Sequence, residues 1–289
     1  MSLDDIFTPC ARIVERADPM RFRTVMAAPV AARGPLFTLY AFNVEVARAP
    51  WVTAEPMIAE MRLQWWRDAL EEMWTKAEVR AHEVTTPLAR VTEPELTAAL
   101  DELVAARRWD IYRDPFEDQA HFDSYIDATS GGLMWTAAAA LGAPEKSEQA
   151  VRALAYGAGV AAFLRAVPAL EAAGRVPLLD GRKQGVAVLA KRALRKMRKP
   201  RVPRAARPAL WPAIGAKVTL HRAARDALAV AEGRLPEGVP NWRLSASALS
   251  GGLWRWVGAL NDHLGDAGFV VVGLFVACWV LSVLNYRWR

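Results

Sequence analysis

The stretch that decides the fold of this 289-residue chain is Leu39-Tyr40-Ala41-Phe42-Asn43-Val44-Glu45-Val46-Ala47-Arg48-Ala49-Pro50-Trp51. We expect a helix to begin after Ala28-Pro29 and to run to about Ala49, because Pro50 pushes the residue before it out of the α region. Asp18-Pro19 is expected to open an earlier helix, and later helices are expected at about 93–108, 117–140 and 145–168. Runs of β-branched residues are nearly absent before residue 269, so the chain predicts an all-α fold.

Three further stretches follow the first one along the chain. They are Glu60-Met61-Arg62-Leu63-Gln64-Trp65-Trp66-Arg67-Asp68, Gly131-Gly132-Leu133-Met134, and Gly157-Ala158-Gly159-Val160-Ala161-Ala162-Phe163-Leu164-Arg165-Ala166-Val167-Pro168-Ala169-Leu170. Together the four ordered motifs resemble the squalene/phytoene synthase family, over roughly residues 10 to 235. The resemblance implies an isoprenoid-synthase-like helical bundle around a central apolar cavity.

The resemblance also implies two aspartate-rich motifs, which hold magnesium and diphosphate in that family. The positions of these aspartates fall here on Ala47, Arg48 and Trp51 in the first motif, and on Ala166 and Leu170 in the second. Magnesium prefers oxygen ligands, and none of these side chains supplies one. We therefore expect no catalytic residue, no metal ligand and no cofactor, with magnesium required only if the chain is an active enzyme with displaced ligands.

The variant Leu164-Arg165-Ala166-Val167-Pro168 is similar to an aspartate-less branch of the family, which includes the mitochondrial complex I assembly factor with a phytoene-synthase-like domain. This resemblance implies a non-catalytic protein that assists assembly of respiratory complex I and contacts its subunits or assembly intermediates. A prenyl chain or lipid is an expected ligand of the cavity. The alternative is an active prenyl-diphosphate condensing enzyme of the squalene/phytoene synthase type, with atypical metal ligands.

Candidate ligand-binding residues come from the same motifs. Arginine offers a bidentate fork to phosphate oxygens, although ion pairs with nearby carboxylates such as Glu45, Glu60 or Asp68 are the commoner outcome for such residues. Asp123 and Asp127 share one helical face and are interpreted as surface or capping groups. The candidates are Tyr40, Asn43, Arg48, Trp51, Gln64, Trp65, Phe163 and Arg165.

Cysteine and histidine usage gives no sign of a metal site. Cys10 and Cys278 lie in unrelated contexts, and the four histidines are scattered. The acidic N-terminus has no basic leader followed by an apolar core, so no secretory signal is visible. A reducing compartment is the simpler expectation.

The segment 181–225 contains fourteen lysines and arginines and no aspartate or glutamate. It lacks interleaved aromatic residues before Trp211, so a nucleic-acid partner is not expected. A solvated basic surface is the plainer alternative, but an anionic membrane fits the segment better than nucleic acid does. Membrane lipids are therefore the expected partners of this segment.

The last part of the chain strengthens the expectation of a membrane. No charged residue occurs from Ala267 to Tyr286, and about twenty helical residues span the roughly 30 Å hydrocarbon core of a bilayer. We expect two parts, a helical domain at 1–240 and an amphipathic stretch with a C-terminal membrane helix at 241–289, the span lying at about 267–286. The protein would lie on the cytoplasmic side of the inner membrane, with the orientation of the span left open. A buried core helix is the alternative.

Overall fold

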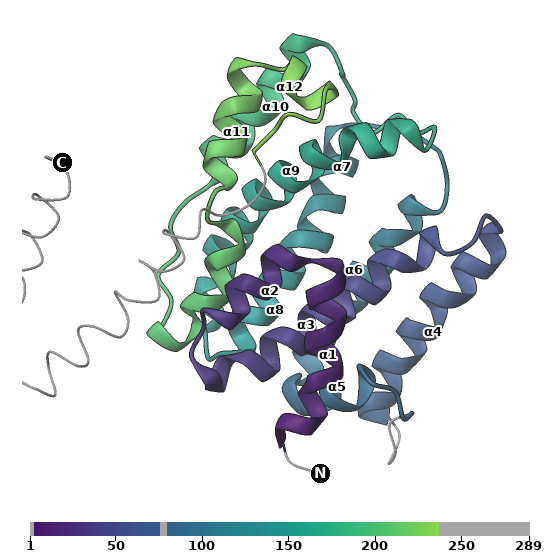
Figure 1. Ribbon diagram of the computed structural model, residues 1–289, viewed down its shortest axis with the longest axis vertical. Helices are drawn as coiled ribbons and strands as arrows, with labels where there is room; N and C mark the ends of the chain where they lie inside the picture. The colour runs from purple at the N-terminus through teal and green to yellow at the C-terminus, as the bar shows by residue number, and fades with distance from the viewer. Residues whose placement is uncertain (1–2, 76–79, 237–289) are drawn as a thin grey trace, which may run out of the picture. The chain divides into compact units, whose positions relative to one another are not determined.

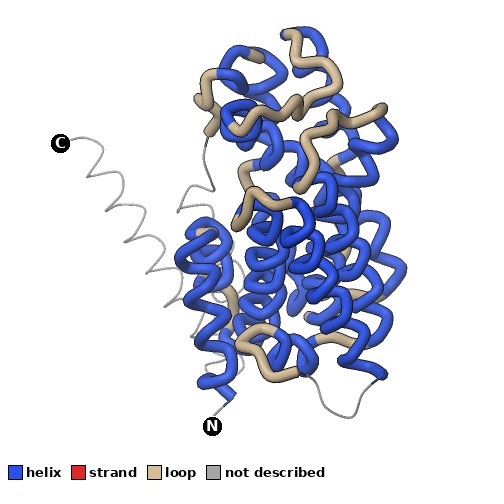
Figure 2. The backbone as a smooth tube through the Cα atoms, turned by 90° about the vertical axis from the view of Figure 1, so that its right-hand side faces the viewer, coloured by secondary structure: helices blue, strands red, loops and turns tan. Residues whose placement is uncertain are grey.

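The computed structural model describes residues 3–75 and 80–236, and every regular element in these ranges is helical (Figure 2). The chain divides into two compact units, Met1–Pro240 and Asn241–Arg289, and the described residues all belong to the first. The membrane helix expected at about 267–286 lies outside the described residues. The all-α prediction is confirmed.

The elements follow one another with short connections (Figure 1). The α-helices are α1 (Leu3–Ala17), α2 (Pro19–Met26), α3 (Val30–Arg48), α4 (Pro56–Thr75), α5 (Thr85–Val91), α6 (Pro94–Ala106), α7 (Gln119–Ile126), α8 (Leu133–Ala140), α9 (Glu148–Ala172), α10 (Lys183–Lys196), α11 (Ala216–Arg225) and α12 (Leu228–Ala231). Short 3-10 turns are η1 (Ala49–Trp51), η2 (Arg107–Asp110), η4 (Glu145–Ser147) and η5 (Arg204–Ala213), and η3 (Asp127–Gly132) is a π-helix.

Helix boundaries follow the local signals in the sequence. Asp18 caps α2, its carboxylate accepting a hydrogen bond from the backbone N–H of Arg21, and Pro19 occupies the first turn, where a missing N–H is tolerated. Helix α3 begins after Pro29 and ends at Arg48, and Pro50 then lies within the 3-10 turn η1. The predicted start and end of this helix are each confirmed to within about two residues.

The predicted helix at 117–140 is instead three consecutive elements, α7, η3 and α8. The π-helix η3 contains Gly131 and Gly132, and it packs against α9. At the contact, a Cβ on Gly159 would lie 2.7 Å from the Cβ of Ser130 and 2.9 Å from Cγ2 of Ile126. A glycine in α9 therefore lets the π-helix approach closely, which periodicity alone does not reveal.

Helix α9 is the central element of the bundle. It packs against α7, η3 and α8, which precede it in the sequence, and against α10, α11 and α12, which follow it. Its stretch Glu145–Ala172 is long and apolar enough to cross a membrane, but 56% of its most apolar window is buried within the bundle. Over the described residues it is therefore the core helix of a helical domain.

Two groups of buried side chains form the core. One surrounds α3 and includes Leu36, Phe42, Leu63 and Leu100. The other surrounds the second half of α9 and includes Phe116, Phe122, Tyr125, Phe163 and Leu164. Burying each such side chain stabilises the fold by roughly 1.5–3 kcal/mol.

The basic segment 181–225 folds as α10, followed by a stretch without regular structure, η5 and α11. Val186, Ala190 and Ala193 form the buried face of α10, whereas its lysines and arginines lie on the other faces. Asp123 ties α10 to α7, because its carboxylate contacts Arg192 and Lys196 and also accepts a hydrogen bond from Tyr156 at 2.6 Å.

The interpretation of Asp123 as a simple surface or capping group is therefore wrong. Burial acts to raise the pKa of its carboxyl, but hydrogen bonds from Tyr156, Gln119 and Lys196 outweigh burial and lower that pKa. Asp127 is more exposed and pairs with Arg152 at 3.1 Å. Neither carboxylate faces the central cavity described below.

Replacing Gly159 with alanine tests the close contact between α9 and η3. A helical glycine-to-alanine change normally stabilises by about 1 kcal/mol, but the contact with Ser130 and Ile126 makes this one overpacked, which typically costs about 1–3 kcal/mol. We expect Gly159→Ala to lower the midpoint of chemical unfolding. Gly181→Ala is the control, because nothing lies within 4 Å of a Cβ there, and an increased stability of Gly159→Ala would contradict the packing described.

Candidate functional site: an arginine-lined cavity

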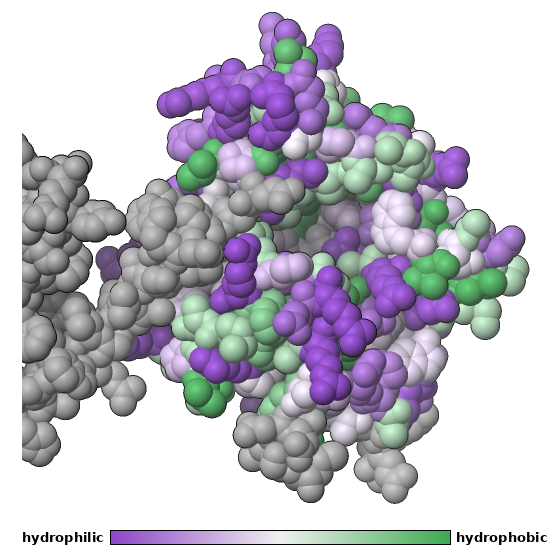
Figure 3. All heavy atoms as spheres, viewed as in Figure 1, coloured by the Kyte–Doolittle hydropathy of each residue, from purple (hydrophilic) through white to green (hydrophobic). Residues whose placement is uncertain are grey.

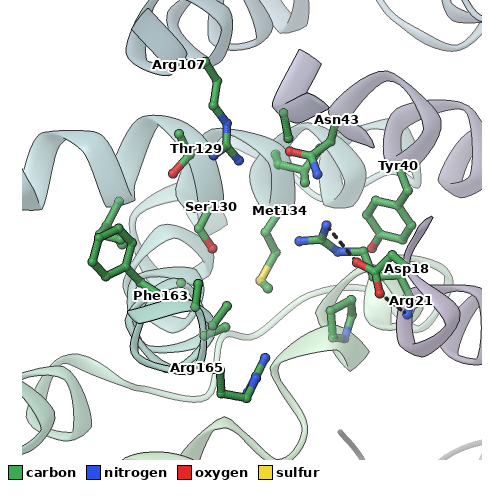
Figure 4. A pocket seen from close by; sticks show the side chains of 18 of the residues that line it. Asp18, Arg21, Tyr40, Asn43, Arg107, Thr129, Ser130, Met134, Phe163 and Arg165 are labelled. Carbon is green, nitrogen blue, oxygen red and sulfur yellow. Dashed lines mark hydrogen bonds and ion pairs between the residues drawn. The ribbon is translucent and has the colours of Figure 1, made fainter. Parts of the chain in front are cut away.

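A cavity of about 390 Å³ lies between α2, α3 and the second half of α9. Figure 3 shows that the face of the molecule is hollowed near its middle, and Figure 4 shows the side chains that surround the cavity. The volume lies near the lower end of the range of about 300–1,000 Å³ that is usual for small-molecule sites. The lining residues come from segments between Asp18 and Pro212, so the cavity is formed only in the folded bundle.

Apolar side chains make up most of the wall. They include Leu133 and Met134 at the start of α8, together with Phe163, Ala162 and Leu170 of α9. The π-helix adds two polar groups, Thr129 and Ser130, whose hydroxyls donate to the backbone carbonyls of Tyr125 at 2.6 Å and Ala155 at 2.9 Å. These hydroxyls are therefore already hydrogen-bonded within the protein.

One polar group on the lining is formed by Asp18, Arg21 and Tyr40. Arg21 Nη1 lies 3.3 Å from Asp18 Oδ2, and the guanidinium carbon lies 5.2 Å from the centre of the Tyr40 ring. Figure 4 shows the guanidinium of Arg21 reaching into the cavity. Burial raises the pKa of the Tyr40 hydroxyl to about 12, so this tyrosine stays neutral at physiological pH.

A second group consists of Arg107, Asp110 and Tyr125. Arg107 Nη1 donates to Asp110 Oδ2 at 3.0 Å and to the Tyr125 oxygen at 2.9 Å, and the Tyr125 hydroxyl donates to Asp110 Oδ1 at 3.1 Å. Burial acts to lower the pKa of the Arg107 guanidinium, but Tyr125 and Asp110 outweigh burial and raise that pKa. Burial, reinforced by Asp110, also raises the pKa of Tyr125.

Arg175 fixes the position of this group from outside the cavity. It is buried, and its guanidinium donates to the backbone carbonyls of Asp110, of Trp109 at 3.1 Å and of Tyr112 at 2.6 Å. Its guanidinium carbon also lies 4.8 Å from the Trp51 ring centre, in cation–π contact. Burial lowers the pKa of this guanidinium.

Five of the eight predicted ligand-binding residues line the cavity. They are Tyr40, Asn43, Trp51, Phe163 and Arg165, and Figure 4 shows Asn43 and Arg165 on different sides of it. The other three do not line it. Arg48 is exposed, Gln64 is exposed and donates to Asp68, and Trp65 packs edge-on against Trp66 and His82.

Sequence reasoning missed most of the polar lining. Arg21 lies three residues after the capping residue Asp18, and Arg107 with Asp110 forms an i,i+3 pair just after a helix, so both carry local signals. The sequence near Tyr125 gives no sign that this residue contacts the pair, because the contact joins two separate elements.

Magnesium does not fit this site. Among the positions that carry aspartates in the resembled family, Ala47, Trp51, Ala166 and Leu170 line the cavity and offer no oxygen ligand. The two carboxylates on the lining, Asp18 and Asp110, are each paired with an arginine. Within residues 3–75 and 80–236, no group of three or more histidine, cysteine, aspartate or glutamate side chains is placed to hold a metal ion.

A profile of the squalene/phytoene synthase family matches residues 14–179, which is more than half of the chain. The chain belongs to the squalene/phytoene synthase family. Among solved structures, this family member is similar to a dehydrosqualene synthase, with a TM-score of 0.69, 15% identity and coverage of 87% of this chain and 97% of that one. Squalene synthase HpnC from Alicyclobacillus acidocaldarius gives a TM-score of 0.65 at 16% identity, covering 81% and 97% of the two chains. These likenesses confirm the isoprenoid-synthase-like fold.

Several relatives found by sequence similarity are named as complex I assembly factors and not as synthases. The Drosophila melanogaster homolog of NADH dehydrogenase (ubiquinone) complex I, assembly factor 6, is 28% identical over 170 residues, covering 55% of this chain and 50% of that protein. The human protein of that name is 23% identical over 170 residues, covering 55% and 48%. The match therefore spans about half the length of these relatives.

A third relative is of another kind. The high-affinity nickel transport protein of Cupriavidus necator is 49% identical over 41 residues, which are 14% of this chain and 12% of that protein. A match this short assigns neither the family nor the activity of that transporter to this chain.

Removing one partner of the Arg107–Asp110 pair should destabilise the protein strongly. Asp110 is only 3% exposed, and breaking a buried ion pair from one side typically costs about 3–5 kcal/mol. We expect Arg107→Met and Asp110→Asn each to lower the free energy of unfolding by an amount of this order, and the double variant to lose less than the sum. Denaturant unfolding followed by circular dichroism measures both effects.

The control is the exposed pair Arg182–Asp180, whose arginine side chain is 86% exposed. Arg182→Met should leave unfolding unchanged. Strictly additive losses at Arg107 and Asp110 would show that the two residues do not act as a coupled pair.

Proposed function

We propose that this protein is a non-catalytic member of the squalene/phytoene synthase family that assists assembly of respiratory complex I at the membrane. The observation that carries the proposal is the chemistry of the cavity, where Ala47, Trp51, Ala166 and Leu170 stand at the family's aspartate positions. Without oxygen ligands from these positions, the departing diphosphate of a condensation reaction has no metal to neutralise its charge. Binding is then the function that the cavity retains.

The similarity to complex I assembly factor 6 supports the assembly role. It rests on 28% identity to the fly homolog over 170 residues, and on similar matches to the mammalian proteins. Fold alone does not assign a function, since one fold serves many activities. The partners on this proposal are complex I subunits or assembly intermediates.

A prenyl chain or lipid is the ligand that the cavity fits best. Its wall is largely apolar, formed by Leu133, Met134, Phe163 and Leu170, with arginines among the polar groups. About 390 Å³ suits one ligand of modest size better than the two prenyl diphosphates that a head-to-head condensation needs at once.

Attachment to the cytoplasmic side of the inner membrane is the second part of the proposal. Exposed basic residues gather on α10 and the stretch after it, including Lys191, Arg195, Arg198, Lys199 and Arg201. Each basic residue near an anionic bilayer contributes about 1 kcal/mol, and the apolar segment 267–286 adds hydrophobic insertion, which salt does not screen. Release of the full-length protein from membranes by a high-salt wash without detergent would contradict this anchoring.

The alternative function is an active prenyl-diphosphate condensing enzyme with atypical metal ligands. The likeness to dehydrosqualene and squalene synthases favours it at the level of fold alone, because both identities are below 25%. The two functions predict different losses when the protein is absent: assembled complex I for the assembly role, and prenyl lipids for the enzyme.

Deleting the gene should lower the amount of assembled complex I in the membrane and leave carotenoid and hopanoid pools unchanged. Native gel electrophoresis of membranes and lipid profiling measure the two outcomes in the same strain, and re-expression of the wild-type chain is the control. Normal complex I together with altered prenyl lipids would favour the enzyme instead.

A further inference from the structure

Large apolar side chains are exposed where η1 leads into α4. Met57 is 76% exposed and Met61 66%, and the two share one side of α4 because they lie four residues apart. Trp51, Val52 and Ile58 are exposed beside them. Figure 3 shows apolar side chains gathered at the right of the molecule, where Figure 1 places α4. Single apolar residues are normal on a surface, but a gathering of this kind marks a site of contact.

A buried arginine joins this group to two other segments. The guanidinium carbon of Arg175 lies 4.8 Å from the Trp51 ring centre, and its Nη1 donates to the backbone carbonyl of Tyr112 at 2.6 Å. The exposed Tyr112 side chain reaches α4, where its hydroxyl donates to Glu60 Oε1 at 3.2 Å. Val176, which follows Arg175, is exposed as well. The group at η1 and α4 therefore forms one apolar face together with Tyr112 and Val176.

The apolar face meets the cavity at Trp51. This tryptophan lines the cavity and is also 47% exposed, so the cavity wall reaches the surface there. Ala47, one turn earlier on α3, lines the cavity too and adds no charge. An apolar ligand would thus pass from the face to the cavity along apolar side chains.

The charges beside η1 and the start of α4 favour an anionic partner. Arg48 and Arg62 are exposed, and neither pairs with a carboxylate in the part of the chain that the structure describes. Glu55 is the exposed acidic residue between them, and Glu60 is neutralised by Arg108 at 3.0 Å. Two unpaired cations therefore flank the apolar side chains against one unpaired anion. Apolar side chains with a cationic rim are the pattern of surfaces that lie in an anionic bilayer.

The length of the chain after the described domain allows the face to reach a membrane. Thirty residues, 237–266, separate Pro236 from the apolar segment 267–286, and such a length spans at most about 100 Å. A domain tethered in this way can bring any of its faces to the bilayer. Leu179 is also exposed and comes just before Arg182 and Lys183, so the apolar face adjoins the start of the basic segment 181–225 in the chain.

We propose that this apolar face lies in the interfacial layer of an anionic bilayer, so that the cavity opens toward the lipid. Tryptophan and tyrosine are favoured in that layer, and arginines reach the lipid headgroups while their stems stay on apolar surface. The inference rests on the proposed function, because it names the surface by which the anchored protein meets its membrane. A protein partner and a second copy of this chain are the other occupants that the experiment must separate.

An environment-sensitive fluorophore on the full-length protein tests the proposal, in vesicles of phosphatidylcholine and phosphatidylglycerol. It is attached to Met57→Cys in a chain that also carries Cys278→Ser. Burial raises the pKa of the Cys10 thiol to about 12, so the label does not react there. A lipid that carries a quencher near its headgroup should quench the fluorophore at position 57 at least twice as strongly as at the control position.

The control is Val30→Cys in the same background. Val30 is 72% exposed, like Met57, but it begins α3 and lies about 27 Å along that helix from Arg48. High salt should leave the quenching at position 57 in place, because apolar insertion is not screened. Equal quenching at the two positions, or none at position 57, would overturn the inference.

A double variant, Met57→Ser with Met61→Ser, tests whether these side chains hold the face in the lipid. With the fluorophore at Val52→Cys, the double variant should lose at least half of the quenching by lipid. The thermal unfolding midpoint should stay unchanged, because both methionines are exposed. Full quenching in the folded double variant would contradict the proposal.

The outcomes separate this inference from the proposed function. Absence of quenching at position 57 in a protein that resists a high-salt wash would overturn the inference and leave the anchor standing. If that protein also forms a disulfide-linked dimer through Met57→Cys, the occupant is a second copy. If it does not, and the double variant lowers assembled complex I in cells, the occupant is a protein partner. Quenching as predicted, with complex I unaffected by deletion of the gene, would support the inference and refute the assembly role alone.

Discussion

The buried carboxylate of Asp110 holds together the end of the bundle at which the cavity lies. Its side chain accepts hydrogen bonds from Arg107 and Tyr125, and its backbone carbonyl accepts one from Arg175. Arg175 in turn makes cation–π contacts with Trp51 and Trp109. Four separated segments, η1, η2, α7 and the loop after α9, therefore depend on one charged residue and its partners.

The apolar core explains how the family's fold is kept although the side chains that line the cavity differ from those of the family's enzymes. The core around α3 and α9 is apolar and independent of any ion, so replacing aspartates at the cavity leaves the packing of the bundle intact. What changes is the set of groups offered to a ligand. Arginine side chains now line the space, and a guanidinium can hydrogen-bond an anion directly, whereas carboxylates would need a bridging cation.

The sequence predicted the helices well because their ends carry local signals. Asp18 with Pro19 and Pro29 mark helix starts, and Pro50 marks the end of α3. It also placed Asn43, Trp51, Phe163 and Arg165 at one cavity, since residues of two long helices line it from opposite sides. The π-helix η3, the Asp123 contacts with α10 and the Arg107–Tyr125 hydrogen bond were missed, because each depends on tertiary packing between elements.

The side chains at the family's aspartate positions predict that this cavity does not ionise a prenyl diphosphate. The most direct test of this prediction is an assay of diphosphate release from labelled farnesyl diphosphate by the purified full-length protein, with magnesium or manganese present. We expect no release above the control without protein, at any concentration of metal. Protein-dependent release that EDTA abolishes would contradict it, because that result requires metal ligands that Ala47, Trp51, Ala166 and Leu170 do not provide.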